Sequence, residues 1–262
     1  MKVIKDLLAA FSLYSRIPMP HVRFEKGEGN GAILFLPLVG VVIGGAVIGA
    51  LLLNRLLGLP TFVLMILLSV IPLALTGGFH LDGFLDVEDA LSSFQDKEKR
   101  LQILKDPHIG SFAVIRFSLF VMLWLGALYL LIYCAGRSGE ALVLYQYALL
   151  FAAARSFCGL SCLLQKKARP EGMLDRETRE TGTGGLFFLA LEAGIFSLLL
   201  VLIKPLPGVL VLAGIAVFTL YYGRLCRKSF GGVTGDTAGF YVAVCELTGL
   251  MLLAGYSLWL VS

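Results

Sequence analysis

Long runs of apolar residues, separated by short polar segments, dominate the chain. Seven of these runs approach the roughly 20 residues that a helix needs to cross the hydrocarbon core of a bilayer. The predicted spans are residues 31–53, 59–79, 111–135, 141–165, 184–203, 206–223 and 239–261. The sixth is the weakest, because it is short and follows Pro205 and Pro207. The pattern predicts an all-α, polytopic membrane helix bundle of about seven transmembrane helices, forming a single integral membrane domain over residues 1–262.

A shorter apolar run precedes the first span. It follows Lys2 and Lys5 and is ended by Pro18 and Pro20, and no small-residue cleavage site of a secretory signal comes after it. We therefore predict an N-terminal interfacial helix within segment 1–30.

Composition supports a membrane protein. Hydrophobic residues make up 58% of the chain and charged residues 15%, whereas soluble domains carry about 25% charged residues. The net charge of +4 does not indicate nucleic-acid binding, since in a membrane protein the placement of lysine and arginine carries the information. The five cysteines include no CxxC pair, so we interpret them as small buried side chains rather than a zinc site or disulfides.

The basic residues predict an orientation. Of the 22 lysines and arginines, 17 fall in the N-terminal segment and in the connections 80–110, 166–183 and 224–238. The alternate connections hold only Arg55, Arg137 and Lys204. Because basic loops are retained in the cytoplasm, we predict a multi-pass protein of the cell inner membrane with a cytoplasmic N-terminus, an external C-terminus and three cytoplasmic loops. The mixed charges of loop 166–183 fit either a lid or a solvated loop.

An acidic motif follows the second span, in HLDGFLDVED from residue 80 to residue 89. If a helix continues through it, Asp82, Asp86 and Asp89 are spaced i, i+4, i+7 on one face, while Glu88 points elsewhere. Three carboxylates on one face repel one another unless a cation lies among them, and all-oxygen ligands suit Mg²⁺, especially beside phosphate. A solvated acidic helix start is the alternative. The closeness to the membrane favours the metal.

Two further side chains flank this motif. His80 can serve proton transfer near neutral pH or hydrogen bonding at the membrane interface. Lys105, in LKDPHIG, can neutralise phosphate or anchor the chain on the cytoplasmic side.

A glycine-rich segment, GGVTGDTAG, precedes the last span. Gly231, Gly232 and Gly235, with Asp236, open a helix, and such a segment can bind an anion through backbone N–H groups. A plain glycine-rich turn entering a membrane helix is equally compatible.

Four charged residues fall inside the predicted spans. They are Arg116, Arg155, Glu192 and Glu246. We predict that all four face the interior of the bundle, as a salt-bridge network or as the lining of a polar cavity.

Taken together, the motifs resemble the cobalamin synthase family, whose activity is that of an adenosylcobinamide-GDP ribazoletransferase. The resemblance rests on FSLYSRIPMP, FLPLVGVVIG, GGFHLDGFLDVEDA, LKDPHIGSFAV, ARPEGM and GGVTGDTAGF, in this order along nearly the whole chain. The chain departs from the family's acidic motif at Glu88 and at Ala90, where a small residue and a glycine are usual.

This resemblance implies an Mg²⁺-dependent transfer of the cobinamide-phosphate moiety of adenosylcobinamide-GDP. The acceptor is the 3'-hydroxyl of alpha-ribazole or its 5'-phosphate, and the products are adenosylcobalamin, or its phosphate, and GMP. By this interpretation Asp82, Asp86 and Asp89 bind the metal, and Asp82, His80 and Lys105 are the catalytic candidates. The candidate substrate and phosphate ligands are Lys105, Arg155, Arg169, Gly231, Gly232, Gly235 and Asp236.

Two other functions stay open at the level of the sequence. A CDP-alcohol phosphotransferase does related chemistry, but its alanine–arginine pair is missing after Asp82 and Gly83. A cation- or proton-coupled transporter would explain the charges inside the spans, although no internal repeat is evident. The sequence leaves the formation of a homo-oligomer undecided.

Overall fold

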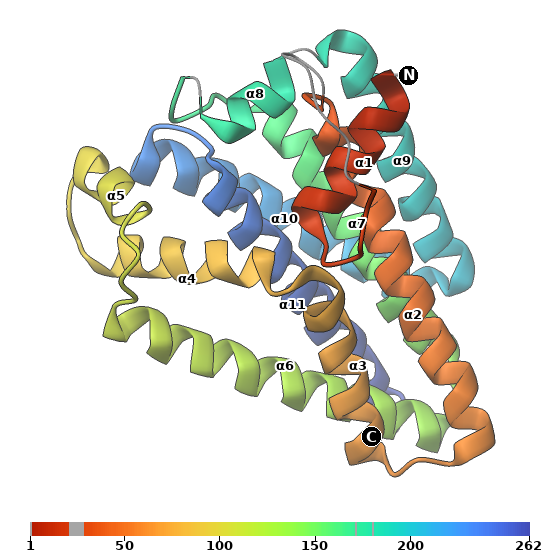
Figure 1. Ribbon diagram of the computed structural model, residues 1–262. Coiled ribbons are helices and arrows are strands. Elements are labelled where there is room, and N and C mark those ends of the chain that lie inside the picture. The colour runs from red at the N-terminus through yellow and green to blue at the C-terminus, as the bar shows by residue number, and fades with distance from the viewer. Residues whose placement is uncertain (1, 21–28, 171, 180) are drawn as a thin grey trace.

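The structure, a computed structural model, describes residues 2–20, 29–170, 172–179 and 181–262. This part of the chain is helical (Figure 1), and its one strand-like pairing is a bridge between Lys167 and Val233. Arg23 and Lys26, which contribute to the basic N-terminal segment, and Glu171 of the ARPEGM motif lie outside the described residues. The predicted all-α class is confirmed.

Eleven α-helices and one 3₁₀ helix make up the described part. They are α1 (Lys2–Tyr14), η1 (Ala32–Phe35), α2 (Leu36–Leu57), α3 (Thr61–Thr76), α4 (Phe79–Ser92), α5 (Lys97–Ile103), α6 (Ser111–Ser138), α7 (Leu142–Leu164), α8 (Met173–Arg179), α9 (Gly182–Ile203), α10 (Pro205–Phe230) and α11 (Gly235–Trp259). Six segments are long and apolar enough to cross a membrane: η1 with α2, then α6, α7, α9, α10 and α11. The pair α3 and α4 passes the same test only jointly, which gives seven spans if the pair counts as one. The predicted polytopic bundle is therefore confirmed.

The second predicted span is broken near its end. Gly77 and Gly78 adopt φ values of +64° and +80°, a left-handed conformation that glycine takes without steric cost. They end α3 and turn the chain by 89° into α4, which runs across the direction of α3 and along α6 (Figure 1). Residues 80–110, predicted as a loop, therefore contain all but the first residue of α4 and the whole of α5, and the acidic motif lies on a helix.

The sixth predicted span is also longer than expected. It was predicted to end at Gly223, but α10 has 26 residues and continues to Phe230. Gly223 lies inside the helix and packs against the side chain of Gln165, where a Cβ would lie 3.2 Å from its Oε1 atom. Residues 224–230, predicted as a loop, are helical, and Arg227 and Lys228 lie in the last turn, where the helix dipole favours positive charge.

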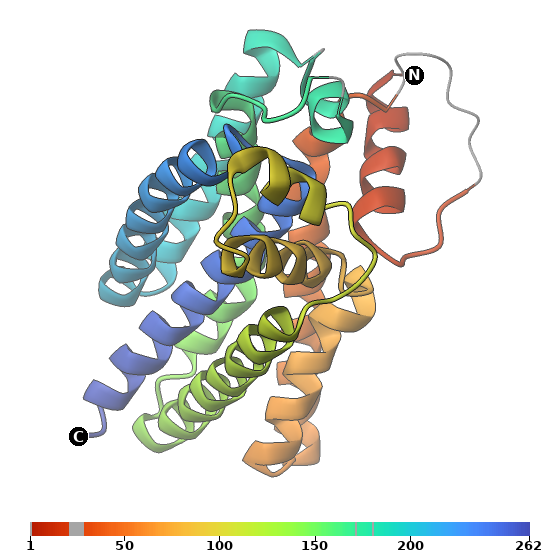
Figure 2. The same cartoon turned by 90° about the vertical axis from the view of Figure 1, so that its left-hand side faces the viewer.

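Two of the spans, α7 and α11, form the centre of the bundle and are the most buried. Helix α2 packs tightly on α7 through Gly40 and Gly44, where a Cβ would lie 2.4 Å from the carbonyl oxygens of Phe151 and Ala148, respectively. Small residues four positions apart allow such close helix contacts in membranes. Figure 1 and Figure 2 show α1 beside α2 at one end of the bundle and the C-terminal end of α11 at the other.

Candidate active site

The acidic helix α4 is held against the start of α11 by two glycines. A Cβ on Gly83 would lie 2.6 Å from the backbone oxygen of Asp236, and a Cβ on Gly239 would lie 3.0 Å from the backbone oxygen of His80. A side chain at Gly83 would force the helices apart, and one at Gly239 would crowd them. The contact brings Asp236 close to the aspartates of α4, so that Asp86 experiences the negative charges of Asp82, Asp236 and Asp89.

The first turn of α11 is fixed by a capping box. The hydroxyl of Thr234 accepts a hydrogen bond from the backbone N–H of Thr237 at 3.2 Å, and the Thr237 hydroxyl accepts one from the backbone N–H of Thr234 at 2.8 Å. The Thr234 hydroxyl also lies 3.3 Å from Asp236 Oδ2. Asp236 therefore has a defined position beside α4.

The loop between α7 and α8 covers the same place. Its backbone pairs with the segment before α11: Val233 N–H donates to Lys166 at 2.8 Å, and Ala168 N–H donates to Val233 at 2.9 Å. Gly232 makes this pairing possible, since a Cβ there would lie 2.4 Å from the Lys166 carbonyl oxygen. The pairing places Lys167 and Arg169 opposite the acidic helix.

Together these elements enclose a cavity of about 200 Å³. We call it the charged pocket, after the polar residues that line it: Asp82, Lys167, Arg169, Asp175, Thr234 and Asp236. Arg169 also donates to the carbonyl of Leu101 on α5, and its positive charge acts on Asp236. Burial lowers the pKa of Lys167, although the negative charge of Asp175 opposes this shift. Two cations and three carboxylates thus meet in one small space.

Helix α8 lies over the charged pocket and is tied to α1. The Tyr14 hydroxyl donates a hydrogen bond of 2.6 Å to Glu177 Oε2, and both side chains are buried. Burial raises the pKa of Glu177, and the hydrogen bond from Tyr14 opposes the rise. The described part of loop 166–183 therefore packs on the bundle, with Leu174 and Asp175 lining the charged pocket.

Several predicted site residues lie in or beside this pocket. Asp82, Arg169, Gly235 and Asp236 line it. Gly231 ends α10 with φ +76° and Gly232 serves the backbone pairing, so their positions are explained by packing without an anion. Lys167, Asp175 and Thr234 also line the pocket but were not among the predicted site residues. Thr234 lies within the GGVTGDTAGF motif, and Lys167 and Asp175 lie close to ARPEGM, so the motifs pointed only to that region.

Other predicted residues lie elsewhere. Lys105 is exposed after α5 and does not line the pocket. Asp89 points to the start of α6, where a Cβ on Gly110 would lie 1.9 Å from its Oδ1 atom. His80 and Arg155 line a different, apolar cavity.

Of the four charged residues predicted inside the spans, three are buried and one is exposed. Arg155, Glu192 and Glu246 are buried, as predicted, and Arg155 forms an ion pair with Glu246. Glu192 Oε2 is buried without a hydrogen-bond partner in the described part of the chain. The prediction was wrong for Arg116, whose side chain is 60% exposed and lies 3.8 Å from Glu88. Arg116 belongs to the first turns of α6, where Phe112, Val114 and Ile115 are exposed as well.

The donor atoms on α4 and α11 suit Mg²⁺. Three or more His, Cys, Asp or Glu side chains do not converge on one point anywhere among the described residues. Asp82 and Asp89 are seven residues apart, about 10 Å along a helix, so the two ends of the stripe are far apart for one ion. Magnesium is usually held by one or two carboxylates, with water and substrate phosphates completing its shell. Asp82, Asp86 and Asp236 lie near one another and can supply one or two carboxylates of this kind, although the three do not converge on one point.

Comparison with known proteins decides the family. A family model described as cobalamin-5-phosphate synthase matches residues 6–254. The chain belongs to this family. Its relatives include adenosylcobinamide-GDP ribazoletransferases of Lachnoclostridium phytofermentans, 34% identical over 94% of this chain and 92% of the relative, and of Pseudomonas paraeruginosa, 34% identical over 97% and 99%. A Clostridium botulinum relative of the same name is 29% identical over 95% of this chain and 96% of its own. No solved structure matches the chain.

Membership of the cobalamin-5-phosphate synthase family confirms the family predicted from the motifs. It favours a ribazoletransferase over the two alternatives, a CDP-alcohol phosphotransferase and a transporter. The match also covers the elements that form the charged pocket, from α4 to the start of α11.

Proposed function

We propose that the charged pocket transfers the cobinamide-phosphate moiety of adenosylcobinamide-GDP to alpha-ribazole or its 5'-phosphate. The observation that carries this proposal is the meeting of Lys167 and Arg169 with Asp82 and Asp236 in one cavity. A pyrophosphate substrate needs cations around its oxygens, and a metal bound to it needs carboxylates. The charged pocket offers both.

In this reaction the acceptor's 3'-oxygen forms a bond to the cobinamide-side phosphorus, and the bond from that phosphorus to the oxygen of GMP breaks. The proton of the 3'-hydroxyl is released. Such transfers depend on in-line positioning and on neutralising phosphate charge more than on covalent catalysis. Lys167 and Arg169 supply fixed positive charge, and Arg169 is positioned by its bond to the Leu101 carbonyl.

We propose Mg²⁺ as the cofactor, held by Asp82 and Asp86 with Asp236 beside them. When bound, the ion would neutralise the pyrophosphate and the repulsion among these carboxylates. Asp89, which lies against Gly110, would then add negative charge to the site without sharing the same ion.

We also propose that the charged pocket faces the cytoplasm of a cell inner membrane. It is built from α4 and from the loops that carry most of the basic residues, and the positive-inside rule places such loops in the cytoplasm. At the opposite connections, Lys204 pairs with Glu140 at 2.5 Å and Arg55 donates to the Tyr145 hydroxyl at 2.9 Å.

An assay of the purified protein tests the activity. GMP release from adenosylcobinamide-GDP should require both alpha-ribazole and Mg²⁺, and omission of either should abolish it. Release without the acceptor would indicate a hydrolase, and release with EDTA present would remove the metal from the proposal.

A further inference from the structure

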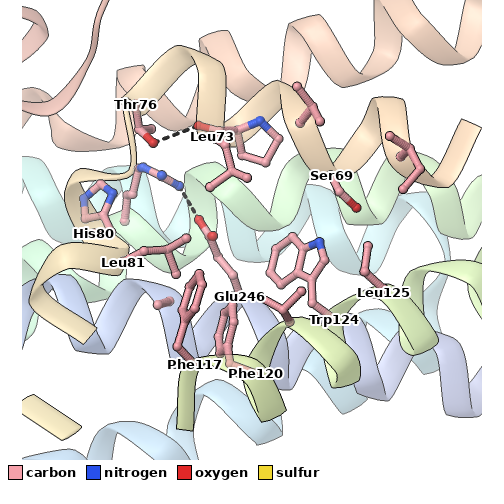
Figure 3. A pocket seen from close by; sticks show the side chains of 16 residues that line it. Ser69, Leu73, Thr76, His80, Leu81, Phe117, Phe120, Trp124, Leu125 and Glu246 are labelled. Carbon is pink, nitrogen blue, oxygen red and sulfur yellow. Dashed lines mark hydrogen bonds and ion pairs between the residues drawn. The ribbon is translucent and has the colours of Figure 1, made fainter. Parts of the chain in front are cut away.

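A second cavity, of about 250 Å³, lies between α3, α4, α6, α7 and α11 (Figure 3). One wall is aromatic: Phe117, Phe120 and Trp124 of α6 point into it at the i, i+3, i+7 spacing of one helix face. Apolar side chains of α3 form much of the remaining lining. We call this space the aromatic cavity.

One end of the aromatic cavity is polar. His80, Arg155 and Glu246 line it, and each is at least nine-tenths buried. Arg155 donates to Glu246 and to the Phe151 carbonyl, but its Nε has no partner in the described part of the chain. No hydrogen bond joins the His80 ring to another described residue. Unused hydrogen-bonding capacity inside a membrane bundle is costly, so these groups favour a ligand that bonds with them.

Aromatic walls with a few polar groups at one end are typical of sites for planar heterocycles. A cavity of about 150 Å³ binds one benzene ring, so this larger one has room for two fused rings. It is too small for a corrin macrocycle. The shape and chemistry therefore match a fused azole such as benzimidazole, with its free ring nitrogen toward the polar end.

We infer that the aromatic cavity binds the planar base of the acceptor nucleoside, which names a substrate subsite for the proposed transfer and rests on it. His80 and Leu81 line this cavity and directly precede Asp82, which lines the charged pocket. A small cavity shares His80 with the aromatic cavity and Gly235 with the charged pocket, so the three spaces adjoin. A base held in the aromatic cavity therefore places its ribose at the start of α4, beside the phosphate-binding cations.

A lipid acyl chain is the competing occupant. Ile66, Val70 and Leu73 line the cavity and are 39%, 48% and 44% exposed, so it opens sideways between α3 and α6. A saturated chain, however, would leave the polar end unpaired. The base is favoured because it can stack on the aromatic wall and also hydrogen-bond with the polar end of the cavity.

The chain offers a direct binding test. It has two tryptophans, Trp124 in the cavity and the exposed Trp259, so Trp259→Phe leaves Trp124 as the sole reporter. Benzimidazole added to this protein in detergent should change Trp124 fluorescence saturably. Val121→Phe, which fills the cavity, should weaken binding by about tenfold or more, and Met122→Phe, on the 69% exposed neighbour, should not. A response that does not saturate, or equal responses of the two variants, would overturn the inference.

Phospholipid carrying bromine on its acyl chains provides a measurement that needs no cavity variant. If the base occupies the cavity, benzimidazole should relieve any quenching of Trp124 by this lipid. Quenching that benzimidazole leaves unchanged would assign the cavity to a lipid chain and overturn the inference.

Kinetics separate this inference from the proposed function. Val121→Phe should raise the KM for alpha-ribazole about tenfold and leave the KM for adenosylcobinamide-GDP unchanged. If no variant or wild-type protein releases GMP, the transfer proposal fails, while the fluorescence titration still decides whether an azole binds. If transfer proceeds and both KM values are unaffected in folded Val121→Phe protein, the subsite is refuted.

Discussion

At the scale of single residues, Asp82 and Glu88 provide the sharpest contrast on α4. Asp82 lines the charged pocket, whereas Glu88 points to Arg116 on α6. Asp82→Asn keeps the size of the side chain but removes a ligand charge, so transfer should fall by at least about 10²- to 10³-fold in folded protein. Glu88→Gln should be much milder. GMP release by both variants measures this, and similar losses would indicate a generic negative patch rather than a metal site.

Lys167 is the second residue to test: its ammonium donates to the carbonyls of Cys162 and Gln165 at the end of α7, and its neighbour Lys166 is exposed and outside the pocket. Lys167→Gln should lower kcat/KM by roughly 10- to 100-fold, the worth of a hydrogen bond to a charged group. Lys166→Gln should leave it nearly unchanged. Equal effects of the two substitutions would exclude Lys167 from the phosphate site.

The pKa of Lys167 adds a pH dependence. Because burial lowers this pKa, the ammonium group loses its proton at a lower pH than an ordinary lysine does. The profile of kcat/KM should therefore decline on its alkaline side before the ordinary lysine pKa is reached. Lys167→Arg, whose guanidinium stays charged, should remove that decline. A decline that persists in Lys167→Arg would assign it to another group.

Residue-level reasoning from sequence succeeded where chemistry is local. The spacing of the aspartates placed Asp82 and Asp86 on one helix, and the structure bears out that helix. The sequence pattern did not predict a role for Lys167, because Lys167 comes near α4 only through the backbone pairing of Val233 with Lys166. Arg116 was placed inside because hydropathy alone does not show that the first turns of α6 are exposed.

At the scale of elements, the contact between α4 and α11 depends on glycine. Gly83→Ala would put a Cβ 2.6 Å from the Asp236 backbone oxygen, so the helices must separate. We expect a loss of about 1–3 kcal/mol in stability and of most transfer activity, since Asp236 and Asp82 move apart. Thermal unfolding in detergent and GMP release measure the two effects.

Gly126→Ala on α6 is the matched control, because a Cβ there meets nothing within 4 Å. Its higher helix propensity should leave stability unchanged or raise it by up to ~1 kcal/mol. If Gly83→Ala behaves like Gly126→Ala, close contact between α4 and α11 is not required for the site.

The length of the apolar runs predicts that most of the helices exist, but it does not predict where they end. Gly77 and Gly78 break a span, whereas Gly223 lies inside α10, although all are glycines in apolar surroundings. The difference lies in the backbone: Gly77 and Gly78 adopt left-handed φ values, whereas Gly223 stays helical and packs against the side chain of Gln165, just after α7. Sequence patterns therefore predicted the bundle but neither the bend that creates α4 nor the full length of α10.

At the scale of the whole molecule, the cavities adjoin one another through shared lining residues. The charged pocket lies where α4, the α7–α8 loop and the start of α11 meet, and the aromatic cavity lies deeper, between α3 and α6. An acceptor with an apolar base and a polar ribose matches this order, and the phosphate donor approaches from the side of the basic loops. The bend at Gly77 and Gly78 matters for function because it lets one helix, α4, line both spaces.

This arrangement requires a definite orientation in the membrane. The distribution of basic residues predicts that the C-terminus is external, at the end of the bundle away from α1 (Figure 2). All five native cysteines are buried and unpaired, so they can be replaced by alanine or serine to give a clean background. A cysteine added after Ser262 should then react with an impermeant thiol reagent in intact cells. A cysteine replacing Lys105, in the basic connection between α5 and α6, should react only after lysis. The reverse pattern would place the charged pocket on the external side, where cytoplasmic nucleotide substrates do not reach it, and would overturn both the orientation and the proposed site of transfer.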